Sequence, residues 1–330
     1  MTIIPFTLNT RRLELDQERK TLALSDGDAC IELPRAEVAQ MVSFLLAHPA
    51  FFEDRPASPP CPIPVVPSMA SLLEDGIFTA DTSTRLLMGV HVSTGEPYWS
   101  TWQDFRSGGA FGRGRSGATN TLAFLIAQAL LGGVEVWVAD PHFNKSTGLT
   151  ALLRPLAHRV RLAGTTDDVE KMIHDWDEEM DRRKAESGPY KPLVVVFDEW
   201  NTLLEHFDRE AEEAGEKGSF SMAVAASAIR CAREMCGYEM FVLLGVNSFA
   251  DKEISGEALR CLLHTVLCHR MTSDHSRLVL SDKKWGRQTE GLRTGSFILR
   301  DNEMLYSLLT APLVEVSDMR TIERLLREAE

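Results

Sequence analysis

The feature that most constrains this 330-residue chain is a glycine-rich loop that leads directly into an apolar helix pattern. The loop reads Gly112-Arg113-Gly114-Arg115-Ser116-Gly117-Ala118-Thr119-Asn120, which has the G-x-x-x-x-G-K-[ST] spacing of a phosphate-binding loop except that alanine stands at the lysine position. In such a loop, main-chain N–H groups and the positive end of the following helix surround a phosphate. A surface turn is the alternative interpretation of the glycines, so the loop alone does not establish a nucleotide site.

A buried strand supplies a second element. The apolar run Leu193–Phe197 is followed by Asp198-Glu199, and a continuous apolar run is typical of a strand covered on both faces of a parallel sheet. Nucleotide hydrolysis needs one carboxylate to hold the Mg²⁺ shell and a second to polarise the attacking water, both at the carboxyl end of a strand. Together with Thr119, whose hydroxyl is placed to reach Mg²⁺, the pair makes a site for ATP and Mg²⁺ the leading hypothesis.

The rest of the chain alternates strand and helix patterns, which predicts an α/β fold with a mainly parallel central sheet and helices on both faces. The predicted strands are 85–92, 134–138, 159–162, 193–197, 240–245, 265–270, 296–299 and 304–308. The predicted helices are 68–73, 121–131, 167–184, 220–235, 257–263 and 317–327. The acidic stretch 206–219 is expected to be a solvated loop or helix end, and residues 104–107 are less apolar than the strand before such a loop usually is.

Proline marks the domain boundary. The segment 51–67 contains six prolines, which disfavour a helix or central strand and predict an extended linker. Residues 1–50 before it read as a small accessory module, with a hairpin over 12–16 and 21–25, a third strand over 29–33 and a helix over 37–48. We expect an accessory or docking module that could bind a protein partner. A nucleic-acid contact is the open alternative, although the basic residues Arg11, Arg12, Arg19 and Lys20 are few. Residues 68–330 form the main domain.

Composition sets outer limits. A net charge of −13 argues against a surface that is basic throughout, although it allows a local basic channel. No apolar run approaches the length of a membrane span, and no signal peptide is visible over residues 1–10. The six cysteines contain no C-x-x-C pair, which suits reduced thiols and leads us to expect a cytoplasmic protein.

Several segments in a fixed order resemble one known family, the FtsK/HerA group of P-loop DNA-pumping ATPases. The resemblance spans roughly residues 85–310 and rests on the order and spacing of the pieces rather than on any single one. The segments that carry it are 108–120, Asp140-Pro141, Val194–Glu199, Ala232–Tyr238, Leu243–Ser248, Thr265–Ser273 and Gly291–Leu299.

The resemblance implies a RecA-like P-loop NTPase that couples ATP hydrolysis to movement along double-stranded DNA as a hexameric ring. By position, Glu199 would activate water, Asp198 would hold the metal shell and Asn247 would sense the γ-phosphate. A neighbouring subunit would complete each site with an arginine, for which Arg233 is the first candidate and Arg230 the second. A solvated arginine or an intrachain ion pair is the alternative for either one.

Ala118 departs from the family pattern, and the missing lysine should cripple turnover because it stabilises charge on the β- and γ-phosphates. Three explanations are open: a laboratory variant, a naturally inactive relative retained as a nucleotide-binding or ring-forming scaffold, or replacement of the charge by Arg113 or Arg115. Retention of Thr119 and the two carboxylates favours the first.

A rival metal site can be drawn from Cys261, His264, Cys268 and His269, since sulfur and imidazole are good zinc ligands. The family pattern places a helix-to-strand junction between them. We therefore do not expect these side chains to converge.

Overall fold

The computed structural model describes residues 68–76, 85–213, 215, 220–247 and 263–330, together with the backbone of four strands between residues 3 and 34. The chain divides into two compact units, Met1–Pro62 and Ile63–Glu330. The predicted linker 51–67, the predicted helix 37–48 and residues 257–262 of the predicted helix 257–263 lie outside the described residues, and Leu263 is not helical. Within the described part, no helix is both long and apolar enough to cross a bilayer.

The first unit is an antiparallel sheet of four strands in sequence order. They are β1 (Ile3–Leu8), β2 (Arg11–Asp16), β3 (Thr21–Asp26) and β4 (Ala29–Pro34). The predicted hairpin corresponds to β2 and β3, where Leu13 faces Leu24. The sequence interpretation did not include β1, whose run is interrupted by Pro5. Proline has no N–H to donate to a neighbouring strand. It is tolerated in β1 because β1 is an edge strand, with a partner strand on one side alone.

The second unit is built on a ten-stranded sheet with the order β6-β5-β14-β13-β12-β7-β11-β10-β8-β9. Six neighbouring strands are parallel: β12 (Thr265–Cys268), β7 (Ser107–Phe111), β11 (Met240–Val246), β10 (Leu193–Phe197), β8 (Glu135–Ala139) and β9 (Arg161–Ala163). Four antiparallel strands extend one side: β13 (Ser296–Arg300), β14 (Tyr306–Thr310), β5 (Arg85–His91) and β6 (Pro97–Thr101). The predicted α/β fold with a mainly parallel sheet is confirmed.

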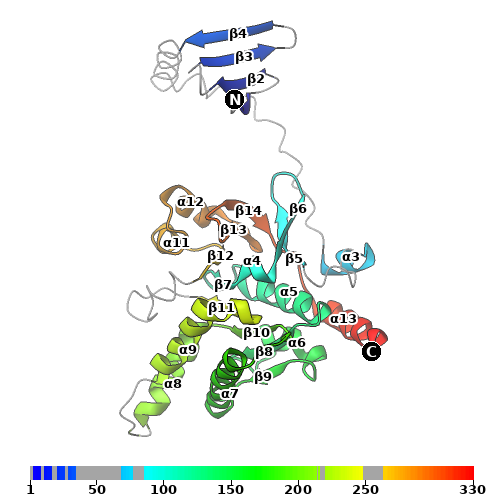
Figure 1. Cartoon of the computed structure of the whole chain (residues 1–330), viewed down its shortest axis with the longest axis vertical. Helices are drawn as coiled ribbons and strands as arrows, with labels where there is room; N and C mark the ends of the chain where they lie inside the picture. Colours follow the sequence, from blue (N-terminus) through cyan, green and yellow to red (C-terminus); the bar gives the residue numbers. More distant parts are fainter. Residues whose placement is uncertain are drawn as a thin grey trace. The chain divides into compact units, whose positions relative to one another are not determined.

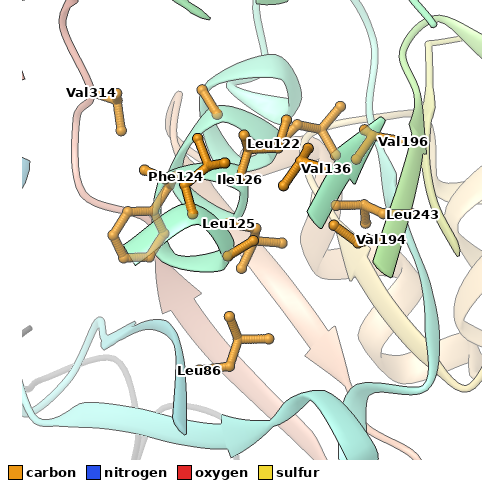
Figure 2. Close-up of a cluster of buried hydrophobic side chains, with 14 of the residues drawn as sticks. Leu86, Leu122, Phe124, Leu125, Ile126, Val136, Val194, Val196, Leu243 and Val314 are labelled. Carbon is orange, nitrogen blue, oxygen red and sulfur yellow. The ribbon is translucent and has the colours of Figure 1, made fainter. Parts of the chain in front are cut away.

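Helices cover both faces of this sheet (Figure 1). One face packs against α7 (Thr166–Ala185), α8 (Trp200–Glu213), α9 (Phe220–Glu234) and α11 (Ser273–Leu280). The other packs against α3 (Met69–Glu74), α5 (Ala118–Leu131), α6 (Leu149–Leu153) and α13 (Val316–Ala329). Strand β10 shows the division, because Val195 and Phe197 belong to the first core and Val194 and Val196 to the second. Figure 2 shows Val194 and Val196 beside Leu122 and Leu243 in the second core. A strand buried on both faces therefore needs apolar residues at every position.

The strand before the loop begins later than the sequence indicated. Instead of residues 104–107, the strand is β7, so residues 108–111, which the sequence interpretation grouped with the loop, belong to the strand. Gly108 and Gly109 belong to the strand because neighbouring rings fill the space that a side chain would need. A Cβ on Gly108 would lie 2.2 Å from the Phe105 ring, and one on Gly109 would lie 2.4 Å from the Phe111 ring.

Three other parts of the structure differ from the sequence expectations. Residues 206–213 are the end of helix α8, the second of the two alternatives, and its start at Trp200 was not predicted; Leu203, Leu204 and Phe207 make a buried stripe behind the acidic residues. The helices α11 and α12 (Lys283–Gln288) and the strand β6 were not predicted. The last helix begins after Glu315, whose side chain forms a capping box with Asp318, rather than at Ser317.

Candidate nucleotide-binding site

The parallel strands bring four chain segments to one edge of the sheet. Phe111 faces Val246 across β7 and β11, and Phe197 faces both Leu244 and Ala139 across β10 and its neighbours. The residues that follow these strands therefore lie at the same carboxyl edge, which is where ligands bind in open α/β sheets. Strand β11 lies between the loop strand β7 and the carboxylate strand β10.

Main-chain hydrogen bonds fix the loop between β7 and α5. The N–H of Gly112 donates to Val246 O at 2.9 Å, and that of Arg113 donates to Arg270 O at 3.1 Å. Ser116 O accepts from Gly295 N at 2.9 Å. Gly117 has a φ of 104°, and a Cβ there would lie 2.6 Å from Gly295 N. The loop shape thus requires glycine at 117 on both conformational and packing grounds.

A cavity of about 390 Å³ lies over this loop. It is lined by Gly112, Arg113, Gly114, Arg115, Ser116, Gly117, Ala118, Thr119, Asp198, Glu199, Gly245, Val246, Asn247 and Thr294. The structure thus gathers into one cavity nearly all the residues proposed from the sequence for ATP and Mg²⁺. Its volume falls in the usual range of about 300–1,000 Å³ for small-molecule sites.

Asn120 is the loop residue that does not line the cavity. Its amide Nδ2 donates to Pro312 O at 2.8 Å, and its Oδ1 accepts from Val314 N at 2.9 Å. These bonds tie the first turn of α5 to the segment before α13. The structure therefore gives Asn120 a structural role at this position.

The cavity has the donors and acceptors that a phosphate and its metal need. The N-cap residue of helix α5 is Gly117, which has no side chain to cap the helix, so no capping side chain competes with a ligand for the first N–H groups of α5. Ser116 Oγ and Asn247 Oδ1 are buried and have no hydrogen-bond partner within the described residues. Buried polar atoms are normally paired, so two unpaired ones lining one cavity fit a bound polar ligand.

The carboxylates at the end of β10 lie in a strongly negative environment. Asp198 is only 4% exposed, and burial raises its pKa to about 7, helped by the charges of Asp140 and Glu199. The N–H of Glu199 donates to Asp198 Oδ1 at 3.0 Å. Gly245 leaves room for this carboxylate, because a Cβ there would lie 2.5 Å from the same oxygen. A buried carboxyl group beside two others is suited to binding a cation.

The sequence interpretation missed His142 and Asp140 as site residues. His142 Nε2 lies 2.7 Å from Glu199 Oε2, and the His142 N–H donates to Asp140 Oδ1 at 2.7 Å. Both follow β8, which neighbours β10. For Asp140 a signal was present in the sequence, because this residue follows a predicted strand just as Asp198 does.

The two arginines proposed for the neighbouring site lie elsewhere in this chain. Arg230 and Arg233 are on α9, and neither lines the cavity of its own chain. Arg230 pairs with Asp177 at 3.4 Å and with Asp181, both on α7. Arg233 is exposed. In the rival zinc set, His264 and His269 flank opposite ends of β12, and Cys261 lies outside the described residues.

The glycine-rich loop, the strand order and the paired carboxylates are together the features of a P-loop ATPase fold. No protein-family profile matches the sequence, and no curated protein matches it. Solved structures do. The pCW3 conjugation coupling protein TcpA, in a monomer form with ATPγS, has a TM-score of 0.64 at 15% identity, covering 100% of this chain and 92% of that one.

Two secretion proteins also share the fold. EssC (ATPases 2 and 3) from Geobacillus thermodenitrificans has a TM-score of 0.57 at 16% identity over 74% of this chain. The cytoplasmic domain of the type VII secretion ATPase EccC from Thermomonospora curvata has a TM-score of 0.56 at 16% identity over 79% of this chain. The present chain spans 49% of the EssC chain and 34% of the EccC chain. The fold expected from the FtsK/HerA resemblance, that of a P-loop ATPase, is confirmed.

Proposed function

We propose that this chain is the motor domain of an ATP-dependent double-stranded DNA translocase of the FtsK/HerA type, in which Ala118 holds hydrolysis low. The observation that carries the proposal is the single cavity lined by the loop residues, Asp198, Glu199 and Asn247. A chance glycine turn would not be expected to meet two strand-end carboxylates and an unpaired asparagine. The TcpA structure with the same fold contains ATPγS.

Each part of the cavity has a distinct role in this proposal. The N–H groups of residues 112–119 and the α5 end bind the phosphates of ATP, and Ser116 Oγ donates to one of them. Thr119 and Asp198 hold Mg²⁺, which when bound neutralises phosphate charge. Glu199 orients and polarises the attacking water. Asn247, at the end of the strand between loop and carboxylates, contacts the γ-phosphate.

The ring and the DNA rest on the resemblance. In a hexamer, Arg233 of one subunit would reach the site of the next, and its exposure leaves it available. Arg230 is the weaker candidate, because its ion pairs with α7 would have to break first. Residues 1–50 would bind a protein partner that directs the motor.

Restoring lysine tests the enzyme reading. Ala118 is one of the residues that line the cavity, so Ala118→Lys would bring an ammonium group to the phosphate site. We expect ATPase activity to rise at least about 100-fold, because one charge-stabilising donor is worth on the order of 10²–10³ in rate. DNA should stimulate this activity further. Ala118→Met, with similar length and no charge, is the matched control and should stay at the basal rate.

A nucleotide-binding or ring-forming scaffold is the second candidate, and the observation that favours it is alanine at the lysine position itself. Such a scaffold would bind ATP and form a ring, yet Ala118→Lys would hydrolyse nothing with or without DNA. An Ala118→Lys chain that neither binds nor hydrolyses ATP would refute both readings. Mass measurement with ATP and DNA tests the ring separately.

A further inference from the structure

The Glu199 carboxylate is held on one side by residues outside the nucleotide loop. Its Oε2 lies 2.7 Å from His142 Nε2 and accepts a longer bond of 3.3 Å from Thr202 Oγ1. Both contacts fall on the same oxygen, which leaves Oε1 for the cavity that Glu199 lines. The side chains of His142 and Glu199 are only 24% and 27% exposed, so the contact is partly shielded from water.

Glu199 also has an unusual backbone. Its φ is 46°, in the left-handed region that non-glycine residues seldom adopt. Strained backbone persists where surrounding contacts over-determine it, and such residues cluster at functional sites. The carboxylate that follows this strained residue is held by its contacts with His142 and Thr202.

His142 is itself anchored to a buried group. Its main-chain N–H donates to Asp140 Oδ1, while Asp140 Oδ2 accepts from the Thr150 N–H at 2.9 Å and from the Thr150 hydroxyl. Asp140 is 2% exposed. Hydrogen bonds therefore link Thr150 of α6 to Asp140, and Asp140 to the main chain of His142. The His142 ring in turn contacts the Glu199 carboxylate after β10.

We propose that His142 is a positioning residue for hydrolysis: it holds Glu199 Oε2 so that Oε1 faces the water that attacks the nucleotide. The inference rests on the proposed role of Glu199. His142 touches neither the loop nor, by its place outside the cavity lining, the nucleotide. It acts through the orientation of Glu199, and the loop after β8 thereby becomes able to control turnover without altering ATP binding.

The kinetic test uses the Ala118→Lys chain as its background. There, His142→Ala should lower kcat about 10- to 100-fold, a loss typical of a misplaced catalytic group, and leave KM and ATP affinity unchanged. His142→Gln should recover much of the lost kcat, because its amide N–H can replace Nε2 as a donor to Oε2. His174→Ala, which removes a histidine exposed on α7, is the matched control and should not change kcat.

A second measurement needs no hydrolysis. In the chain with Ala118, unfolding by urea is compared for His142→Ala, Glu199→Ala and the double variant. The two effects should be non-additive, since the partners are in direct contact.

Additive effects would show that the contact is absent and would overturn the inference. Non-additive effects with an unchanged kcat in His142→Ala would make the contact merely structural and overturn it as well. An Ala118→Lys chain without ATPase activity would instead remove the proposed function and this inference together, whatever the unfolding measurements show.

Discussion

His269 provides a direct electrostatic test of the packing beneath the nucleotide loop. It follows β12, its side chain is fully buried, and its ring lies 5.1 Å from that of Phe297. Its N–H donates to Phe111 O at 2.7 Å, and a Cβ on Gly112 would lie 2.7 Å from its own Cβ. Burial lowers the pKa of His269 to about 3, with a smaller opposing effect from the nearby main chain of Ser296 and Ser116.

The lowered pKa has a definite consequence for stability. Below pH 6.5 the unfolded chain binds a proton at this residue and the folded chain does not, so the free energy of unfolding falls as pH falls. The loss approaches about 1.4 kcal/mol per pH unit and amounts to about 2 kcal/mol between pH 7 and pH 5. The stability that depends on a neutral His269 is fully present above pH 6.5 and is lost as pH falls toward 3.

The His269→Met variant isolates this contribution, because methionine fills a similar volume and adapts to irregular spaces. Unfolding by urea, followed by tryptophan fluorescence, is measured for both chains at pH 7, 6 and 5. Between pH 7 and 5 the parent chain should lose about 2 kcal/mol more than the variant, since all other titrating groups cancel. Parallel losses would refute the reasoning. If the methionine variant does not fold, His269→Gln serves the same comparison.

Two further predictions test the site. Gly117→Ala should lower the free energy of unfolding, measured by urea titration, by roughly 1–3 kcal/mol, because Gly117 has a φ of 104° and its added Cβ would lie 2.6 Å from Gly295 N. Gly114→Ala is the control. An added Cβ there has nothing within 4 Å, so it should change the free energy of unfolding by less than about 0.5 kcal/mol. Asp198→Asn should raise the melting temperature of the nucleotide-free chain at pH 8, since it removes a buried charge beside Asp140 and Glu199, and should abolish any further rise on adding Mg²⁺ and ATP. A lower melting temperature in the free chain would contradict the assignment of that buried charge.

The sequence predicted the parts of this structure in which one residue pattern has one physical explanation. The run Leu193–Phe197 predicted a strand covered on both faces, and its alternate residues do enter two separate cores. The spacing of Gly112, Gly117 and Thr119 predicted a turn into a helix, which is the junction of β7 and α5. Here local pattern and tertiary packing favour the same outcome.

Other parts needed information that a linear pattern does not contain. In α8 the acidic residues dominate the composition of 206–213, although the helix is stabilised by Leu203, Leu204 and Phe207 on its buried side. Helix α12 is short and polar, and its Trp285 stacks on Tyr306 of a distant strand. His142 was missed because its contact with Glu199 depends on β8 and β10 being neighbours, and sheet order is not visible in the sequence.

The distribution of charges around the cavity shows what an alanine at position 118 removes. Asp198 and Glu199 line the cavity and Asp140 lies behind them, while the two cations of its lining, Arg113 and Arg115, are exposed on the outer loop. Exposed charges are screened by water and salt, whereas charges in a partly buried cavity are screened much less. Phosphates bound here would therefore face net negative charge on the β10 side, offset mainly by the α5 N–H groups and by a metal ion at Thr119 and Asp198. A lysine at 118 would place a cation on the helix side, opposite the carboxylates. Under the proposed function, the missing lysine charge would affect hydrolysis more than binding. The backbone N–H groups that would bind phosphate do not depend on a lysine at position 118.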